Sequence, residues 1–330
     1  MTKLLPNDPI SIYAASIILK HLTAFDKQIP GVLEGKDIEY IHRMRVASRR
    51  LRNAVEIFSI VLPKKKSKSW EQDIRKITRA LSKARDLDVQ IALLVNIDRQ
   101  AVEKQLHPGM RRLKLRLRQK REQLQSGVNQ AIEQIAKDRV VEGIVQYFAG
   151  VPELPDGTGM DDSGLYFLAK TQINARLKDF LAFEPFITDP NAVEELHAMR
   201  IAAKNFRYTL EAFASLYPDQ LEDSIRVVRK TQDLLGEIHD CDVWVTYLPK
   251  FLNKERIRMV DYTGSDQGMR LLKPGLAYFL ENRLYTRQDL YAQFNQEWVV
   301  WREKNIFGTL TDQLNSYAVP DFEVIPTAEE

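Results

Sequence analysis

The chain has 330 residues, 44% of them hydrophobic, and this length predicts a globular protein of two domains that each bury a core. Cys241 is the single cysteine, which excludes an internal disulfide and a cysteine-based zinc site and fits a reducing cytosol. The formal net charge of +3 hides an asymmetry, because residues 42–121 hold 23 Lys and Arg against 7 Asp and Glu. Such a positive field indicates a polyanionic partner, namely nucleic acid, a membrane surface or a phosphate polymer.

The first predicted helix spans residues 10–28. Asp8 is its expected N-cap, a proline follows in the first turn, and Pro30 ends the helix together with the glycine after it. Lys20 stands off the apolar face. The apolar run is too short to cross a bilayer and has no small-residue cleavage site behind it, so we expect neither a signal peptide nor a membrane span.

The second predicted helix, residues 41–58 (IHRMRVASRRLRNAVEIF), has a cationic face. At 100° per residue one flank is apolar, and the opposite flank collects basic side chains. We call this polar flank the basic stripe; it comprises His42, Arg45, Arg49, Arg52 and Glu56. Pro63 ends this helix, and the lysine run at 64–68 is expected to be a solvated turn.

The chain contains the stripe a second time. Residues 196–213 (LHAMRIAAKNFRYTLEAF) carry, at the same spacings, His197, Arg200, Lys204, Arg207 and Glu211. Two other cations of the first copy, Arg43 and Arg50, are replaced by Ala198 and Asn205, as expected of positions that meet only solvent. Repetition of one helix face alone favours a binding site over a solvated surface.

A third helix is predicted from about Ser69, and it bears a second group of cations: Arg75, Lys76, Arg79 and Lys83. The segment ARDLDV follows, where Asp86 is expected to cap a new helix or to pair with Arg85 or another cation. No third ligand stands nearby, so a structural role is favoured over metal binding.

The tripeptide HPG at 107–109 marks the next break, and a very basic helix follows it. Its cations are too dense to share one face, so several must point to water, while Arg112 and Arg116 lie one turn apart and are candidates to line a site. The helix is expected to continue to Phe148 with an interruption near Asp138. Residues 149–163 are rich in Pro, Gly and Asp and are the predicted linker.

The second half repeats the first. Residues 165–183 correspond to the first helix, and Asp189 with Pro190 repeats the Asp-Pro helix start. In the counterpart of the third helix Arg229 and Lys230 match Arg75 and Lys76, whereas Asp233 and Glu237 replace Arg79 and Lys83. The segment KPGLAYFLENRLYTRQDL repeats the HPG segment and leaves Arg283 and Arg287 as its cations, and the tail after about residue 311 is expected to be acidic and loose.

No stretch shows sustained period-two alternation, so the predicted fold is all-α. We expect two antiparallel four-helix bundles, residues 1–150 and 164–330, joined by a linker at 151–163 and related by a pseudo-twofold axis. In that arrangement the two stripe helices face each other across the junction. The two half-sites would then form one central basic groove.

These motifs carry a family resemblance. HRMRVASRRLRNAVEIF, RDLDV and their second copies, HAMRIAAKNFRYTLEAF and HDCDV, resemble the CHAD family, the conserved histidine α-helical domain, from about residue 8 to about 305. The resemblance implies two four-helix bundles around a basic groove that binds inorganic polyphosphate and takes proteins to polyphosphate granules. Many CHAD domains are fused to a CYTH triphosphatase barrel, and nothing here is similar to its alternating glutamates, so a free-standing member is expected.

Carried over position by position, the resemblance implies that the eight basic residues of the two stripes bind polyphosphate. It adds the third-helix cations of both halves and, further out, Lys20, Arg112, Arg116 and Arg283. Asp233 and Glu237 interrupt the second row of cations. The expected location is cytoplasmic, on polyphosphate granules.

The chemistry of the stripes agrees with a phosphate polymer. Arginines one or two turns apart can each fork onto phosphate oxygens, and released counterions make the affinity depend on salt. Aromatic residues are not interleaved with the stripes, which disfavours RNA or DNA as the ligand without removing it from consideration. A membrane is not an expected partner.

A histidine phosphatase or phosphotransferase is the third function class. The sequence has no glycine-rich phosphate loop and no carboxylate cluster for divalent metals, so we expect no enzyme, no catalytic residue, no metal and no cofactor. The duplicated acids are interpreted as i, i+4 partners, Glu56 of Arg52 and Glu211 of Arg207. Histidines among arginines should be neutral when the groove is empty and cationic when phosphate fills it, so affinity should rise as pH falls from about 8 to 6.

Overall fold

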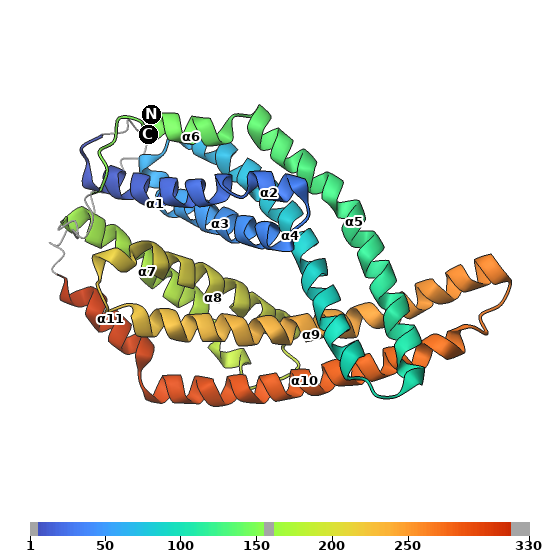
Figure 1. Cartoon of the computed structure of the whole chain (residues 1–330). Helices are drawn as coiled ribbons and strands as arrows, with labels where there is room; N and C mark the ends of the chain where they lie inside the picture. Colours follow the sequence, from blue (N-terminus) through green and yellow to red (C-terminus); the bar gives the residue numbers. More distant parts are fainter. Residues whose placement is uncertain (1–5, 155–161, 318–330) are drawn as a thin grey trace, which may run out of the picture.

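The computed structural model describes residues 6–154 and 162–317, and across these two ranges the chain is helical without a strand (Figure 1). The predicted all-α class is thereby confirmed. The elements of the first half are α1 (Pro9–Asp26), α2 (Ile29–Glu34), α3 (Ile38–Ile57), α4 (Lys64–Gln100), α5 (His107–Lys137) and α6 (Val140–Phe148). Those of the second half are α7 (Ser163–Leu181), α8 (Val193–Phe213), α9 (Glu222–Thr263), α10 (Met269–Glu303) and α11 (Ile306–Ser316).

Helices that follow one another in the chain pack against each other in both halves, from α3 through α5 and from α7 through α10. The halves meet between the stripe helices α3 and α8, between α5 and α10, and between α1 and α7. Figure 1 shows the halves side by side, with the long helices α4, α5, α9 and α10 running together at one end of the molecule. The fold therefore places the two stripes at the junction.

The main hydrophobic core runs without a break from one half into the other. At the junction the ring of Tyr13 in α1 lies 6.0 Å from Phe58 and 6.1 Å from Phe213, and the two phenylalanine rings are 5.7 Å apart. Tyr13 also donates a hydrogen bond to the carbonyl oxygen of Ala212 at 2.8 Å. Aromatic packing thus fixes the angle between α3 and α8.

A second hydrophobic cluster holds the long helices together at the far end of the molecule. Two glycines allow α5 and α10 to approach each other closely there. A Cβ on Gly109 would stand 2.2 Å from the carbonyl oxygen of Leu272, and a Cβ on Gly275 would stand 1.8 Å from that of Leu106. Neither backbone can accommodate such contacts, so both positions require glycine. The HPG and KPG motifs are therefore the places where α5 and α10 cross.

Several predicted boundaries in the first half are wrong. The third helix starts at Lys64 rather than near Ser69, so the lysine run is its exposed first turn and not a loop. Asp86 caps no new helix, because α4 continues to Gln100. Pro30 and the glycine after it lie inside the short helix α2, where proline is tolerated in the first turn.

The predicted N-cap Asp8 is confirmed, since its carboxylate accepts the Ser11 N–H at 2.9 Å. The predicted break near Asp138 is also confirmed, because Arg139 adopts a left-handed conformation with φ of 49° between α5 and α6.

Three features of the second half also differ from prediction. Asp189 starts no helix: its side chain accepts the N–H of Asn191, and α8 begins only at Val193. The KPG segment lies within α10, unlike HPG, because α9 extends further than α4 and the second hairpin is longer. Residues 311–316 are the last turns of α11 and not a loose tail. Part of the predicted linker, residues 155–161, and the tail from 318 lie outside the described residues.

Candidate functional site

Basic side chains of the two stripes lie close together between α3 and α8, and we call this junction the groove. A cavity of about 450 Å³ occupies one end of this groove, and its walls include His42 and Arg45 from α3 and His197 and Arg200 from α8. The predicted juxtaposition of the two half-sites is therefore present at these positions. α4 and α9 close the sides of the cavity with two equivalent pairs of residues, Arg85 with Asp86 and His239 with Asp240.

Local packing aims the stripes into the groove. In α3 the side chains of Met44 and Leu51 are fully buried in the core on the opposite flank, as is Met199 in α8. The helical period then places the basic residues at the junction, where Arg49 and Lys204 are half-buried. Amphipathic helices whose polar faces meet in this way enclose charge that each helix alone would expose to water.

The groove concentrates positive charge. Burial, together with the nearby charges of Arg49 and Arg200, lowers the pKa of Lys204 from 10.5 to about 8. Burial likewise lowers the pKa of Arg49 to about 10, with Arg45 among the repelling neighbours. Arg45 has an acidic neighbour in Asp86, at 3.7 Å, but 62% of the Asp86 side chain remains open to solvent. Asp240 lines the same cavity and attracts Arg200 and Arg45, so the two acids offset part of the positive charge of the groove.

Three histidines line the cavity, and the pKa of each is lowered. The rings of His197 and His239 stack with centroids 4.0 Å apart. Burial lowers the pKa of His239 to about 4, and His197 and Arg200 add repulsion. Burial also lowers the pKa of His42 and of His197, with Arg85 as the next cause for the former and Arg200 for the latter.

Four buried nitrogen atoms of the stripes have no hydrogen-bond partner among the described residues. They are Nδ1 of His42, Nδ1 of His197, Nε of Arg49 and Nε of Arg207. Burying such donors unpaired costs stability, so their recurrence on both stripes indicates a site shaped for something other than stability.

Sequence reasoning missed three residues of the site. Arg85 and His239 line the cavity from equivalent positions, each directly before the first aspartate of RDLDV or HDCDV, and this repetition was the signal that could have found them. Tyr208 is 4% exposed, and the guanidinium groups of Arg49 and Arg207 lie 5.8 and 5.1 Å from its ring centre. Its counterpart in the first stripe helix is an asparagine, so the repeat gave no sign of it.

The acids of the stripes pair differently from expectation. Glu211 does lie 3.6 Å from Arg207, as predicted, but it also binds Arg50 of the other half at 2.8 Å. Glu56 pairs with Arg176 of α7 instead of Arg52. The prediction that position 50 meets only solvent is therefore wrong, because Arg50 joins the two halves.

The predicted third-helix cations of both halves, unlike Arg85, do not line the cavity. Lys76 is exposed and held by Asp73 at 2.8 Å, and Arg229 reaches Glu211 at 3.8 Å. The others, Arg75, Arg79 and Lys83 on α4 and Lys230 on α9, are exposed or half-buried outside the cavity wall, as are Asp233 and Glu237.

Four further candidates lie away from the groove cavity. Arg112 and Arg116 line a different cavity on α5 and α9. Arg283 is 8% exposed and donates hydrogen bonds to Asn282 and Thr286 in α10. Lys20 is exposed on α1.

No group of three or more His, Cys, Asp or Glu side chains within residues 6–154 and 162–317 is arranged to hold a metal ion. In the same ranges no helix is long and apolar enough to cross a membrane.

Comparisons with known proteins agree on one family. The family model for the CHAD domain matches residues 16–249. The crystal structure of the CHAD domain from the plant Ricinus communis superimposes with a TM-score of 0.63 at 23% identity, over 88% of this chain and 93% of that one. PptA from Streptomyces chartreusis gives a TM-score of 0.59 at 13% identity, over 87% and 98%. A search of curated proteins found no match.

Proposed function

The chain belongs to the CHAD domain family, and from that membership we propose that it binds inorganic polyphosphate, without catalysis, in the groove between α3 and α8. CHAD domains are associated with polyphosphate binding in general. The finer assignment rests on the residues of this chain.

The observation that carries the proposal is the surplus of positive charge in the groove. Arg45 and Arg49 from α3 and Arg200 from α8 lie near Lys204, and burial together with their repulsion lowers the pKa of Lys204 to about 8. Asp86 lies 3.7 Å from Arg45, and Asp240 attracts Arg200 and Arg45, so two acids offset part of this charge. Repulsion of this kind costs folding free energy unless an anion compensates it. Polyphosphate carries one negative charge per phosphate, so it can neutralise the cations at each turn of the helices.

The lining of the groove favours a polymer without bases. Binding of single-stranded nucleic acid uses exposed aromatic rings on which bases stack. Among the described residues of the cavity wall the larger aromatic ring is that of Trp244, which is 1% exposed, and Tyr208 behind the stripes is 4% exposed. Phosphate contacts alone are available, and these suit polyphosphate.

The non-catalytic role rests on the state of the histidines. A histidine that accepts a phosphoryl group needs an accessible ring nitrogen and a neighbouring acid or base to assist transfer. Here Nδ1 of His42 and of His197 is buried, and the neighbours that act on their pKa are mainly arginines. We further propose that the groove attaches the protein to polyphosphate granules, as the family resemblance implies.

A competition titration tests the proposal. Long-chain polyphosphate is titrated into the full chain at about 150 mM salt, with single-stranded RNA and duplex DNA as competitors. We expect saturable polyphosphate binding that excess nucleic acid fails to displace, and no release of orthophosphate with or without Mg²⁺. Equal displacement by all three polymers would make the protein a general polyanion binder, and orthophosphate release would make it an enzyme.

A further inference from the structure

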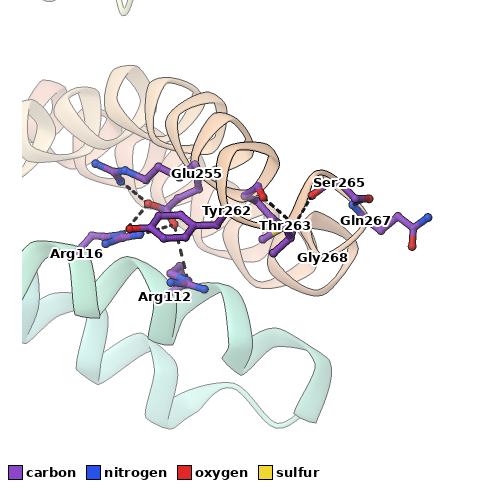
Figure 2. Close-up of a pocket in the computed structure, with 10 residues that line it drawn as sticks. Arg112, Arg116, Glu255, Tyr262, Thr263, Ser265, Gln267 and Gly268 are labelled. Atoms are coloured by element: carbon purple, nitrogen blue, oxygen red, sulfur yellow. Dashed lines mark hydrogen bonds and ion pairs between the residues drawn. The ribbon is translucent and has the colours of Figure 1, made fainter.

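A second cavity, of about 750 Å³, lies where α5 passes α9 and reaches the loop that joins α9 to α10 (Figure 2). Arg112 and Arg116 enter it from α5, and Glu255, Arg258 and Tyr262 enter it from α9. It shares no lining residue with the groove cavity between the stripes. The two cavities are therefore separate sites on the described part of the chain.

A buried carboxylate organises this cavity. Glu255 is 2% exposed, and its Oε1 accepts a hydrogen bond from Nε of Arg116 at 2.8 Å. Nε of Arg112 lies 3.8 Å from Oε2, and Arg258, one turn further along α9, also donates to Oε1. Figure 2 shows Arg112 and Arg116 of α5 reaching this one carboxylate on α9. Burial acts to raise the pKa of Glu255, but the hydrogen bonds from Arg116 and Arg258 outweigh it and hold the pKa below its usual value.

The balance of charge in the cavity is positive. One carboxylate neutralises one guanidinium group, so two positive charges remain at the base of the cavity. A single ion pair would be enough to satisfy the buried Glu255. The shared carboxylate fixes the guanidinium groups in place before any ligand arrives, which lowers the entropy cost of binding an oxyanion.

The remaining wall is suited to an organic group. Tyr262 presents a ring that is 89% exposed, Met259 adds a flexible apolar surface, and hydroxyl groups come from Thr263 and Ser265. A volume of this size exceeds what an inorganic phosphate needs and is typical of small-molecule sites. Guanidinium groups beside an exposed aromatic ring match a ligand that joins phosphate to a planar base.

The acidic and aromatic parts of this cavity lie outside the matched segment of the family. The CHAD family model ends at residue 249, whereas Glu255, Arg258 and Tyr262 belong to the extension of α9 beyond it. The cavity is thus built partly from the longer second hairpin of this chain.

We propose that this cavity binds a nucleoside phosphate, with the phosphate oxygens on Arg112, Arg116 and Arg258 and the base against Tyr262. The binding is independent of the polyphosphate groove.

Calorimetric titration of the full chain with ADP at low salt tests the site. We expect saturable binding at one site, and a loss of about tenfold or more in affinity for Arg258→Ala, because one charge-assisted contact is removed. Arg256→Ala is the matched control: it removes the same charge from an exposed position of α9 that does not line the cavity. Tyr262→Ala should weaken binding of ADP and leave binding of pyrophosphate unchanged.

Three results would overturn the site. They are the absence of saturable ADP binding, equal losses from Arg256→Ala and Arg258→Ala, or loss of ADP binding in Lys204→Ala, which alters only the groove. Polyphosphate binding of Arg258→Ala, measured in parallel, separates failure of this site from failure of the groove.

Discussion

At the level of single residues, the buried charge of Lys204 lowers the stability of the ligand-free protein. Its pKa in the folded chain, about 8, lies below the ordinary value of 10.5, so folding disfavours the protonated amine. The free energy of unfolding of the ligand-free protein should therefore rise as pH increases from about 8 towards 10.5. The penalty disappears when an anion occupies the groove.

Replacement of Lys204 by methionine should separate stability from binding. Lys204→Met keeps the length of the side chain and removes the repelled charge, so we expect the free energy of unfolding at pH 7 to rise by about 1 kcal/mol. Affinity for polyphosphate should fall by about tenfold or more. Chemical denaturation and titration measure the two quantities, and a variant that is less stable than wild type would show that the charge of Lys204 is compensated within the protein.

Affinity for polyphosphate should depend on pH in two ranges. Phosphate raises the pKa of nearby bases, so binding takes up protons wherever the empty groove holds them deprotonated. His42 and His197, whose pKa values are lowered, should make affinity rise as pH falls from about 8 to 6. Lys204, with a pKa of about 8, should make affinity fall as pH rises above 8.

Lys204→Arg tests the upper range. A guanidinium group is a stronger base than an amine, and even the buried Arg49 keeps a pKa of about 10, so titrations of this variant should lose most of the decline between pH 8 and about 9 that wild type shows. An affinity that is constant from pH 6 to pH 10 in wild type would contradict both assignments, that of the lower range to His42 and His197 and that of the upper range to Lys204.

At the level of elements, the crossing of α5 and α10 depends on two glycines. Gly109→Ala and Gly275→Ala each place a methyl group against a backbone carbonyl at 2.2 or 1.8 Å, so the helices must separate. We expect losses of about 3 kcal/mol or more in the free energy of unfolding. Gly127→Ala on α5, where a Cβ meets nothing within 4 Å, should instead stabilise by about 0.5–1 kcal/mol. Thermal melts of the three variants test this prediction. If all three substitutions destabilised the protein equally, the loss would come from the substitution within the helix and not from the helix crossing.

Helix periodicity predicted the elements that carry the site. Alternating apolar and basic flanks in α3 and α8 are decided by local spacing, so sequence was enough to place the stripes. The length of α4 was not predictable in this way. In the sequence Asp86 resembles an N-cap, whereas in the structure it lies in the middle of α4 and contacts Arg45 of α3. The ion pair of Arg50 with Glu211 was missed for the same reason, since it joins residues 161 positions apart.

Tertiary contacts also explain the candidates that lie elsewhere. Arg116 appeared beside the other cations of its run, but the buried carboxylate that holds it comes from α9. Arg283 matched the cationic pattern in sequence and is instead packed within the second half, where its side chain is 8% exposed. Spacing within one helix does not specify which partner helix covers a given face.

At the level of the whole molecule, the hydrophobic core is continuous across the junction. Tyr13, Phe58 and Phe213 link the halves, and the ion pairs of Glu56 and Glu211 cross the same boundary. We therefore expect one cooperative unfolding transition for the full chain, followed by calorimetry, with equal calorimetric and van't Hoff enthalpies. Two separate transitions would show that the halves are independent domains. The pseudo-twofold relation between the halves stays a prediction.

The decisive measurement is polyphosphate affinity in a double variant of the groove. Arg49→Ala with Lys204→Ala removes two charges from the junction, and Lys65→Ala with Lys66→Ala removes two from the exposed first turn of α4. Titration at equal ionic strength should show a loss of about a hundredfold or more for the groove pair and a change of less than about threefold for the control pair. Equal losses for both pairs would contradict a groove site, because net charge alone would then govern binding.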